Sequence, residues 1–310
     1  MNTSTVFEFR ELSCAVCGST ARTHLGWRGG MAHHDHKGER VEIVRCSTCT
    51  HIYPHPMPYP AGTVGDLYDD PDEYFSAHDV EVKKRHGSDL MKFVEEKLGR
   101  KGTMLDVGCG RGELLWAARD AGWNYTGIDP SSAHLEWGRV NLDVQGLLGT
   151  LETVSLPAES FDVVIMGGVI EHLYDPFAAL QEVRRVLKPG GLFYLDAPNE
   201  DALYTQIGNL YFRALRRNWV VNLAPTFPPY HVQGFNPKSL RRLLERTGFQ
   251  LAELHVWGQV SPLTGQRSLR KRLEYRGAQL INWMGNRRGS GIYMDGWAWK
   301  VGLIQARDSF

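Results

Sequence analysis

From residue 103 onward, short apolar runs alternate with stretches in which apolar residues recur at helical spacing. The apolar runs predict strands over residues 103–108, 124–129, 161–167 and 191–197. The stretches that follow predict helices near residues 112–121, 132–141, 176–187 and 237–247. Two later runs, 249–258 and 290–301, predict strands that complete the sheet. Strands separated by helices in this way are typical of an α/β domain with a largely parallel sheet.

The first hundred residues follow a different pattern. Residues 1–60 are rich in Cys, His, Gly and Pro, and the proline-rich run 51–60 cannot sustain a helix, so we interpret it as a linker. Apolar positions spaced among charges predict one or two amphipathic helices over 72–98.

Three regions follow from these patterns. They are a cysteine-rich module at 1–60, a linker with capping helices at 61–101, and the main domain at 102–310 with insertions at 200–232 and 259–289.

Composition and charge narrow the class of protein. The chain of 310 residues is 42% hydrophobic, enough for a sizeable core. Its 35 basic and 35 acidic residues leave no net charge to attract nucleic acid or anionic lipid, so we expect neither partner. We see no leader pattern at the N-terminus and no apolar run near the ~20 residues that a membrane span needs, and we expect a cytoplasmic protein.

Four of the five cysteines form two C-x-x-C pairs separated by 28 residues, namely Cys14 with Cys17 and Cys46 with Cys49. Each pair can present two thiolates to one tetrahedral ion, and four sulfurs leave no open position. The pairs therefore predict a structural zinc site, with free or redox-active thiols as the alternative. Several histidines lie nearby, and the sequence does not assign them a role; they are His33, His34, His36, His51 and His55.

The first strand of the main domain leads directly into a glycine-rich turn, Gly108-Cys109-Gly110-Arg111-Gly112. Glycines allow a sharp turn and a close approach to a ligand. Asp129 follows Gly110 by 19 residues at the end of the next strand, where a carboxylate can bind ribose hydroxyls. A nicotinamide-binding enzyme would show the same two features.

Three further blocks distinguish the alternatives. Asp106 stands two residues before the first glycine, where a carboxylate suits a cationic amino acid better than a pyrophosphate. The segments SLPAESFDVVIMGGVIEHLYDP (155–176) and EVRRVLKPGGLFYLDAPN (182–199) follow. Together, in this order and spacing, the blocks resemble class I S-adenosylmethionine-dependent methyltransferases, strongly over 100–200 and weakly beyond.

The resemblance implies an α/β, Rossmann-like, doubly wound and mostly parallel seven-stranded sheet, here behind a small zinc-ribbon-like module. It places Asp106, Gly108 and Gly110, with Cys109 in the same turn, around the methionine part of S-adenosylmethionine. It places Asp129 on the ribose and Pro130 and Ser131 beside the adenine. Thr150, Leu151 and Glu152 stand where the family often binds the adenine amine, and which of them does so is open. Asp106 could instead cap a helix, and Asp129 could be only a turn residue.

Ligands of this fold lie beyond the carboxyl ends of the strands, so the segment from Gly167 to His172 should face the transferring methyl group. It lacks the Asn/Asp-Pro-Pro-aromatic motif of enzymes that methylate nucleobase amines. His172 and His231 are our candidates for the base that removes the acceptor's proton, with Glu171 as a neighbouring carboxylate. His172 could equally serve only to shape the loop by bonding a backbone carbonyl.

Glu171-His172 also resembles part of the metal site of ubiquinone-biosynthesis and small-RNA-end methyltransferases. Those enzymes place a second glutamate three residues earlier, where this chain has Gly168, so we predict no catalytic metal.

The two insertions differ in chemistry. The segment 200–232 is aromatic and is expected to cover the acceptor, although its rings could simply form their own small core; it carries Tyr204, Tyr211, Phe212, Trp219, Phe227 and Tyr230. The segment 259–289 is basic, which suits a phosphate-bearing acceptor or a solvated helix face; it carries Arg267, Arg270, Lys271, Arg272, Arg276, Arg287 and Arg288.

A cysteine-bound module ahead of this pattern resembles sugar C-methyltransferases and small-molecule O-methyltransferases. Those sugar enzymes usually carry a further large domain, so their substrate does not transfer. We expect methyl transfer to an oxygen or carbon of a small molecule such as a sugar, a glycan precursor or a secondary metabolite. The alternatives are a ribosomal RNA methyltransferase and a non-catalytic zinc-ribbon adaptor. The sequence does not predict the oligomeric state.

Overall fold

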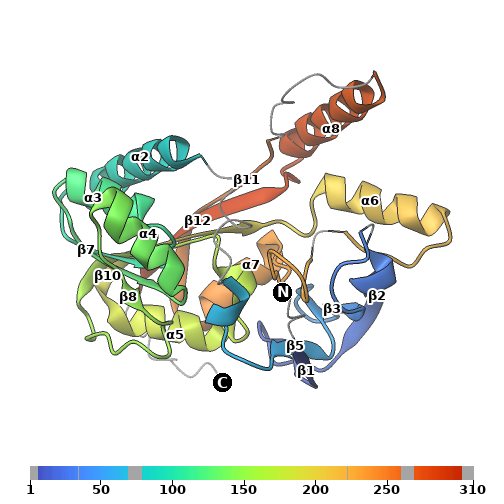
Figure 1. The fold of residues 1–310 in the computed structure, drawn as a ribbon, viewed down its shortest axis with the longest axis horizontal. Coiled ribbons are helices and arrows are strands. Elements are labelled where there is room, and N and C mark those ends of the chain that lie inside the picture. Colours follow the sequence, from blue (N-terminus) through green and yellow to red (C-terminus); the bar gives the residue numbers. More distant parts are fainter. Residues whose placement is uncertain (1–5, 34, 69–78, 222, 260–268, 302–310) are drawn as a thin grey trace, which may run out of the picture.

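The computed structural model describes residues 6–33, 35–68, 79–221, 223–259 and 269–301. Seven strands form its main sheet, in the order β11-β12-β10-β9-β6-β7-β8 (Figure 1). These strands are β6 (Thr103–Val107), β7 (Asn124–Asp129), β8 (Leu147–Leu148), β9 (Phe161–Gly167), β10 (Leu187–Pro198), β11 (Phe249–Trp257) and β12 (Tyr293–Lys300). Strands β6 to β10 pair in parallel, whereas β12 runs antiparallel to β10 and β11. The expected α/β class with a mostly parallel, seven-stranded sheet is confirmed.

Helices cover both faces of this sheet (Figure 1). These covering helices are α2 (Val80–Leu98), α3 (Glu113–Asp120), α4 (Ser132–Leu142), α5 (Pro176–Val186) and α7 (Pro237–Arg246). Two more, α6 (Leu203–Ala214) and α8 (Leu269–Arg287), project away from the sheet (Figure 1). The part of the predicted 72–98 helix that is described is α2, and residues 72–78 lie outside the described residues.

Successive side chains of each strand point to opposite faces of the sheet, so each face has its own hydrophobic core. Met104 and Val163 pack with α2 and α3, whereas their neighbours Leu105 and Val164 pack with α5 and α7. All four side chains are fully buried, which explains why these strands read as continuous apolar runs.

The N-terminal module contains two small sheets. Strands β1 (Phe7–Arg10) and β5 (Met57–Pro60) pair antiparallel, and β2 (Arg22–Arg28), β3 (Val41–Cys46) and β4 (Ile52–Pro54) form a three-stranded sheet. The interpretation of 51–60 as a linker is therefore wrong, because it holds all of β4 and β5. Its prolines are tolerated because a two-stranded ribbon leaves edge positions that need no N–H donor.

The module is bound to the main domain along the segment 218–236. The Trp27 amide donates to Asn218 O (2.8 Å), and the Val220 amide donates to Trp27 O (3.1 Å). Ile52 and Gly234 exchange both of their amide hydrogen bonds, at 3.0 and 2.7 Å. These backbone bonds extend the module's sheets onto an insertion of the main domain, so the two regions share a hydrogen-bonded junction.

Three short 3₁₀ turns complete the described chain, namely Gly30–Ala32, Gly65–Tyr68 and Ile170–His172. Within the described ranges, no helix has the length and apolar character needed to cross a bilayer.

Candidate active site

The glycine-rich turn at the carboxyl end of β6 has the geometry that its sequence predicts. Gly108, Gly110 and Gly112 all have positive φ, at 70°, 54° and 82°. A Cβ at Gly108 would lie 2.5 Å from a methyl carbon of Val169, whereas a Cβ at Gly110 would meet nothing within 4 Å. Gly108 is therefore fixed by close packing, and Gly110 leaves free space above the turn.

Asp129 ties the end of β7 to this turn. One carboxylate oxygen accepts from the Gly110 amide (2.8 Å) and the other from the Ser131 amide (2.9 Å). A carboxylate offers about four acceptor positions, so further positions remain for a ligand's hydroxyls. Asp129 therefore does stabilise the turn, and its carboxylate still has acceptor positions that these two amides do not use.

Asp106 is buried beneath the glycine turn, with about 5% of its surface exposed. Burial, and then the charges of Asp129 and Glu113, raise its pKa well above the ordinary range, and Lys83 opposes that shift. A carboxyl group in this position gains stability from a neighbouring cation.

A cleft of about 550 Å³ opens above the turn, at the carboxyl ends of the parallel strands. Most of the predicted cofactor residues line it: Gly108, Cys109, Gly110, Asp129, Pro130, Thr150, Leu151 and Gly167. Asp106 and Ser131 lie behind that wall and do not line it. Ser131 instead caps α4, accepting from the His134 amide.

The catalytic candidates meet beside this cleft although about sixty residues separate them. The ring centroids of His172 and His231 are 4.8 Å apart, and the Nε2 atoms of both rings lie 3.9 to 4.0 Å from Glu171 Oε1. His172 lines the cleft, and its Nδ1 lies 3.1 Å from the Tyr68 hydroxyl. His231 and Glu171 stand behind it and do not line the cleft.

Burial governs the protonation of this cluster. It raises the pKa of Glu171 to about 8, and the charge of Asp196 adds to the effect. It lowers the pKa of His172 to about 4, although hydrogen bonds to the backbone of Tyr230 and Pro229 act in the opposite direction and raise this pKa. It lowers the pKa of His231 to about 3, and repulsion from His172 adds to this. At neutral pH both rings are therefore uncharged and able to accept a proton.

The same three side chains form a set that could hold a metal ion. Their ligand atoms lie within 4.8 Å of one another, and Glu171 Oε2 is buried without a hydrogen-bond partner. Gly168 stands where related metal sites have a second glutamate, but His231 approaches Glu171 and His172 from a distant part of the chain. The fold supplies that third ligand from the distant insertion.

The four paired cysteines converge as predicted. Sγ of Cys14 lies 3.5 Å from Sγ of Cys49, and Sγ of Cys17 lies 3.5 Å from Sγ of Cys46. Tetrahedral zinc with Zn–S bonds of about 2.3 Å requires sulfur separations of roughly 3.8 Å, and disulfides require about 2 Å. A hydrogen bond from Cys14 lowers the pKa of Cys49 to about 5, which supplies one thiolate. The donor set and its spacing thus fit a zinc ion.

The aromatic insertion does not cover the cleft as expected. No described residue of 200–232 lines it. Tyr204 and Tyr211 are about half exposed on α6, and Phe227 is buried against His33 of the module. The end of the insertion instead contacts the turn after β9, since the amides of Val232, its last residue, and of Gln233, the next residue, both donate to Glu171 O at 2.9 Å. This contact is what brings His231 to His172.

Comparison with known proteins decides the family. The profile described as "Methyltransferase domain" matches residues 77–254, more than half of the chain. The chain belongs to this methyltransferase family. It is 29% identical over 175 residues to a ubiquinone biosynthesis O-methyltransferase of Coxiella burnetii, covering 53% of this chain and 70% of that protein.

Two further relatives agree. A probable S-adenosylmethionine-dependent methyltransferase of Mycolicibacterium smegmatis is 29% identical over 173 residues, which cover 55% of this chain and 60% of that protein. A solved S-adenosylmethionine-dependent methyltransferase of Archaeoglobus fulgidus shares the fold, with a TM-score of 0.51, 20% identity, and coverage of 76% of this chain and all of that one. The protein is an S-adenosylmethionine-dependent methyltransferase, which favours an enzyme over the adaptor alternative.

The sequence patterns do not predict several of the residues that line the cleft of this methyltransferase. Arg10 and Tyr59 reach the cleft from the N-terminal module, Tyr68 from the region 61–101, and Lys83 from α2. They belong to segments that no cofactor motif covers, so only their placement in three dimensions identifies them. His134 follows the Ser131 cap by three residues and could have been predicted from that spacing.

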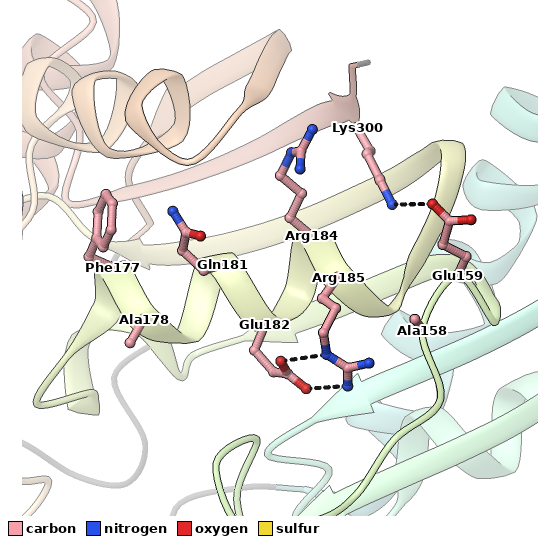
Figure 2. A pocket seen from close by; sticks show the side chains of 9 residues that line it. All are labelled: Ala158, Glu159, Phe177, Ala178, Gln181, Glu182, Arg184, Arg185 and Lys300. Atoms are coloured by element: carbon pink, nitrogen blue, oxygen red, sulfur yellow. Dashed lines mark hydrogen bonds and ion pairs between the residues drawn. The ribbon is translucent and has the colours of Figure 1, made fainter. Parts of the chain in front are cut away.

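A second hollow, of about 810 Å³, lies along α5 at the amino-terminal side of the sheet (Figure 2). Its charged groups mostly satisfy one another, as Glu182 pairs with Arg185 (2.5 Å) and Lys300 pairs with Glu159 (3.3 Å). It contains none of the predicted site residues. The cleft above the glycine turn, which most of the predicted site residues line, is therefore the candidate active site.

The packing of Gly108 leads to a prediction for cofactor binding. Replacing Gly108 by Ala should weaken S-adenosylmethionine binding by tenfold or more, because the new methyl group must displace Val169 beside the cleft. Gly190→Ala is the matched control, since Gly190 also has φ 70° but has open space around its Cβ. Calorimetric titration checks this, and equal affinities for the two variants would contradict it.

The junction with the module contains a further buried carboxyl group, Glu200. Burial raises its pKa to about 8; the charge of Asp201 adds to this, whereas Arg28 and Arg45 oppose it. A pKa raised on folding gives stability that is complete below the ordinary value of 4.5 and is lost as pH rises through about 8. The protein should therefore lose stability between pH 6 and 8 on account of this group.

The variant Glu200→Gln should remove that loss. Between pH 6 and 8 its free energy of unfolding should fall less than that of the wild type, by roughly 1.4 kcal/mol per pH unit at most. Denaturant unfolding at pH 6, 7 and 8 measures this, with Glu245→Gln, an exposed position on α7, as the control. Parallel curves for wild type and Glu200→Gln would show that the group does not titrate in this range.

Proposed function

We propose that this methyltransferase transfers the methyl group of S-adenosylmethionine to a hydroxyl oxygen of a small molecule. The observation that carries the proposal is the meeting of His172 and His231 at Glu171, with His172 on the wall of the cleft. The O-methyltransferase relatives support an oxygen acceptor. A carbon acceptor, as in the sugar C-methyltransferases, is the alternative within the same site.

The cofactor fits the half of the cleft around the glycine turn. Gly108, Cys109 and Gly110 would lie along the methionine part, and Asp106, with its raised pKa, would ionise beside the ligand's ammonium group. Asp129 would accept from the ribose hydroxyls with the lone pairs that Gly110 and Ser131 leave unused. Pro130, Thr150 and Leu151 would enclose the adenine, and Ser131 would support them through its cap of α4.

The bound cofactor supplies an electrophilic methyl group on a sulfonium. The chain's part is to align the acceptor oxygen and to take its proton as the new O–CH₃ bond forms. His172 is uncharged at neutral pH and has the position to accept that proton. Glu171 lies about 4 Å behind His172, and its carboxylate form would stabilise the resulting imidazolium.

The acceptor half of the cleft favours a flat, hydroxyl-bearing ring. Tyr59 and Tyr174 line it and stack on each other with ring centroids 4.4 Å apart, and Tyr68 reaches His172 from the same side. Aromatic walls of this kind bind rings by stacking. A phenolic acceptor therefore suits the site, and its acidic hydroxyl would suit a base as weak as His172.

The proton-transfer role predicts how two variants behave. His172→Ala and His231→Ala should each lower kcat by a hundredfold or more, with the affinity for S-adenosylmethionine nearly unchanged, because neither ring is placed on the cofactor. Transfer of labelled methyl to a panel of phenols, sugars and RNA measures this, and His255→Ala, an exposed histidine on β11, is the control.

Three outcomes would contradict this account. Unchanged turnover in both variants would remove the histidines from the reaction. Wild-type activity that requires added Mg²⁺, together with partial recovery of the variants at much higher Mg²⁺, would make the cluster a metal site. Transfer to RNA but not to small molecules would favour the ribosomal RNA alternative.

We further propose that the four cysteines bind one structural zinc ion. The buried apolar residues of the module, such as Val44 and Tyr53, belong to clusters that it shares with the main domain. The ion would therefore hold the module's own turns together and thereby hold the segment 218–236 in place. The four sulfurs would fill all four coordination positions of the ion, so no position would be open for a substrate or a water molecule.

Zinc binding predicts a specific loss. Cys46→Ser should purify without stoichiometric zinc, unfold at lower temperature, and lose turnover while still binding S-adenosylmethionine, because the cofactor half of the cleft belongs to the main domain. Metal analysis by mass spectrometry and calorimetry check this, and Cys109→Ala, which keeps the four ligands, should retain zinc. A wild-type protein that carries no zinc and tolerates Cys46→Ser would overturn the assignment.

A further inference from the structure

Helices α6 and α8 contact each other and project from the body of the molecule (Figure 1). Large apolar side chains on them are exposed to solvent, for example Leu210 at 66% and Leu273 at 61%. We refer to the exposed surfaces of these two helices together as the α6–α8 face. Its exposed apolar residues are Tyr204, Ile207, Leu210, Tyr211, Leu215, Leu273, Leu280 and Trp283.

The exposed residues of α8 are ordered along the helix. Leu273, Leu280 and Trp283 are seven and then three residues apart, which places them on one side of the helix. Arg276 and Arg287 share that side at the same spacing. An apolar stripe at helical spacing normally faces a core, and here it faces solvent.

The charge of this face is strongly one-sided. The described residues 203–219 and 272–289 hold seven arginines and one acidic residue, Glu274. The structure records no ion pair for the arginines in these segments, and Arg217 and Arg287 lie over the rings of Trp219 and Trp283, at 4.7 and 4.2 Å. The arginines are Arg213, Arg216, Arg217, Arg272, Arg276, Arg287 and Arg288. The neutral net charge of the chain conceals this local segregation.

We infer that the α6–α8 face binds the surface of a membrane that contains anionic lipids. Leucine, isoleucine and tryptophan side chains enter the boundary between headgroups and acyl chains, and arginines beside them contact the lipid phosphates. Neither helix is apolar enough to cross the bilayer, so both lie in its plane.

Charge and composition argue against the other occupants. A second copy related by a two-fold axis would place this arginine-rich face against itself, at a cost in repulsion. Nucleic acid would use the arginines but would leave the exposed leucines and isoleucine in water. Only a surface that is both anionic and apolar complements all of the exposed residues.

This inference rests on the α6–α8 face and not on the identity of the methyl acceptor. None of its apolar residues or arginines lines the cleft. Failure of vesicle binding would leave the proposed methyl transfer untouched, and failure of the proposed methyl transfer would leave vesicle binding untouched.

Flotation with lipid vesicles tests it on the full-length protein. The wild type should bind vesicles of phosphatidylglycerol and phosphatidylcholine and should bind pure phosphatidylcholine far more weakly. Replacing Arg276 and Arg287 by Glu should lower partitioning roughly thirtyfold or more, since each cation near an anionic surface contributes on the order of fivefold. Replacing Leu280 and Trp283 by Glu should abolish it.

Matched variants control for exposure and charge. Val140→Glu alters a residue of α4 that is 63% exposed, and paired Arg241→Glu and Arg242→Glu change the same charge on α7. Both controls should bind vesicles as the wild type does, and thermal unfolding should show that all variants are folded.

Three results would overturn the inference. They are absence of wild-type binding to anionic vesicles, equal losses in the control variants, and a dimer or a nucleic-acid complex that the α8 variants disrupt while vesicle binding persists in them.

Discussion

The active site depends on one contact, in which the Glu171 carbonyl accepts hydrogen bonds from the amides of Val232 and Gln233. Glu171 belongs to the turn after β9, which the sheet fixes beside the glycine turn. Val232 ends a long insertion that contributes no strand to that sheet, and Gln233 follows it directly. Because two backbone bonds join them, His231 reaches His172 and the cleft gains a cluster of proton-accepting groups. Without this contact the fold would still offer a cofactor cleft, but His172 would line it without His231 behind it.

The N-terminal module holds the segment 232–234, which makes this contact, through hydrogen bonds of its own. His51 Nε2 lies 2.7 Å from Gln233 Oε1, and Gly234 exchanges backbone hydrogen bonds with Ile52. The Cys46–Cys49 turn directly precedes these residues. The cysteine cluster is thus connected through β4 and residues 232–234 to Glu171. The module thus supports the segment that carries the proposed catalytic residue His231, which gives a physical reason for its presence on this methyltransferase.

The sequence was sufficient wherever local pattern decides structure. Alternating strands, the Gly108–Gly112 turn and Asp129 at the end of β7 were predictable, because parallel strands bring their carboxyl ends to one edge. The convergence of four cysteines was predictable from their spacing. Arg10, Tyr59 and Lys83 in the cleft were not, because segments distant in sequence deliver them. The prolines of 51–60 were misleading, since burial of Ile52, Tyr53 and Met57 outweighs their low strand propensity. The sequence also did not predict that apolar residues of α8 are exposed, because the many arginines of this segment indicated only a basic helix.

A crystal structure of the protein with S-adenosylhomocysteine would test the central claim most directly. The account predicts that Asp129 bonds both ribose hydroxyls and that the sulfur points along the cleft toward His172, with His231 and Glu171 directly behind it. A sulfur that points away from His172, or a complex in which residues 232–233 have left Glu171, would contradict it.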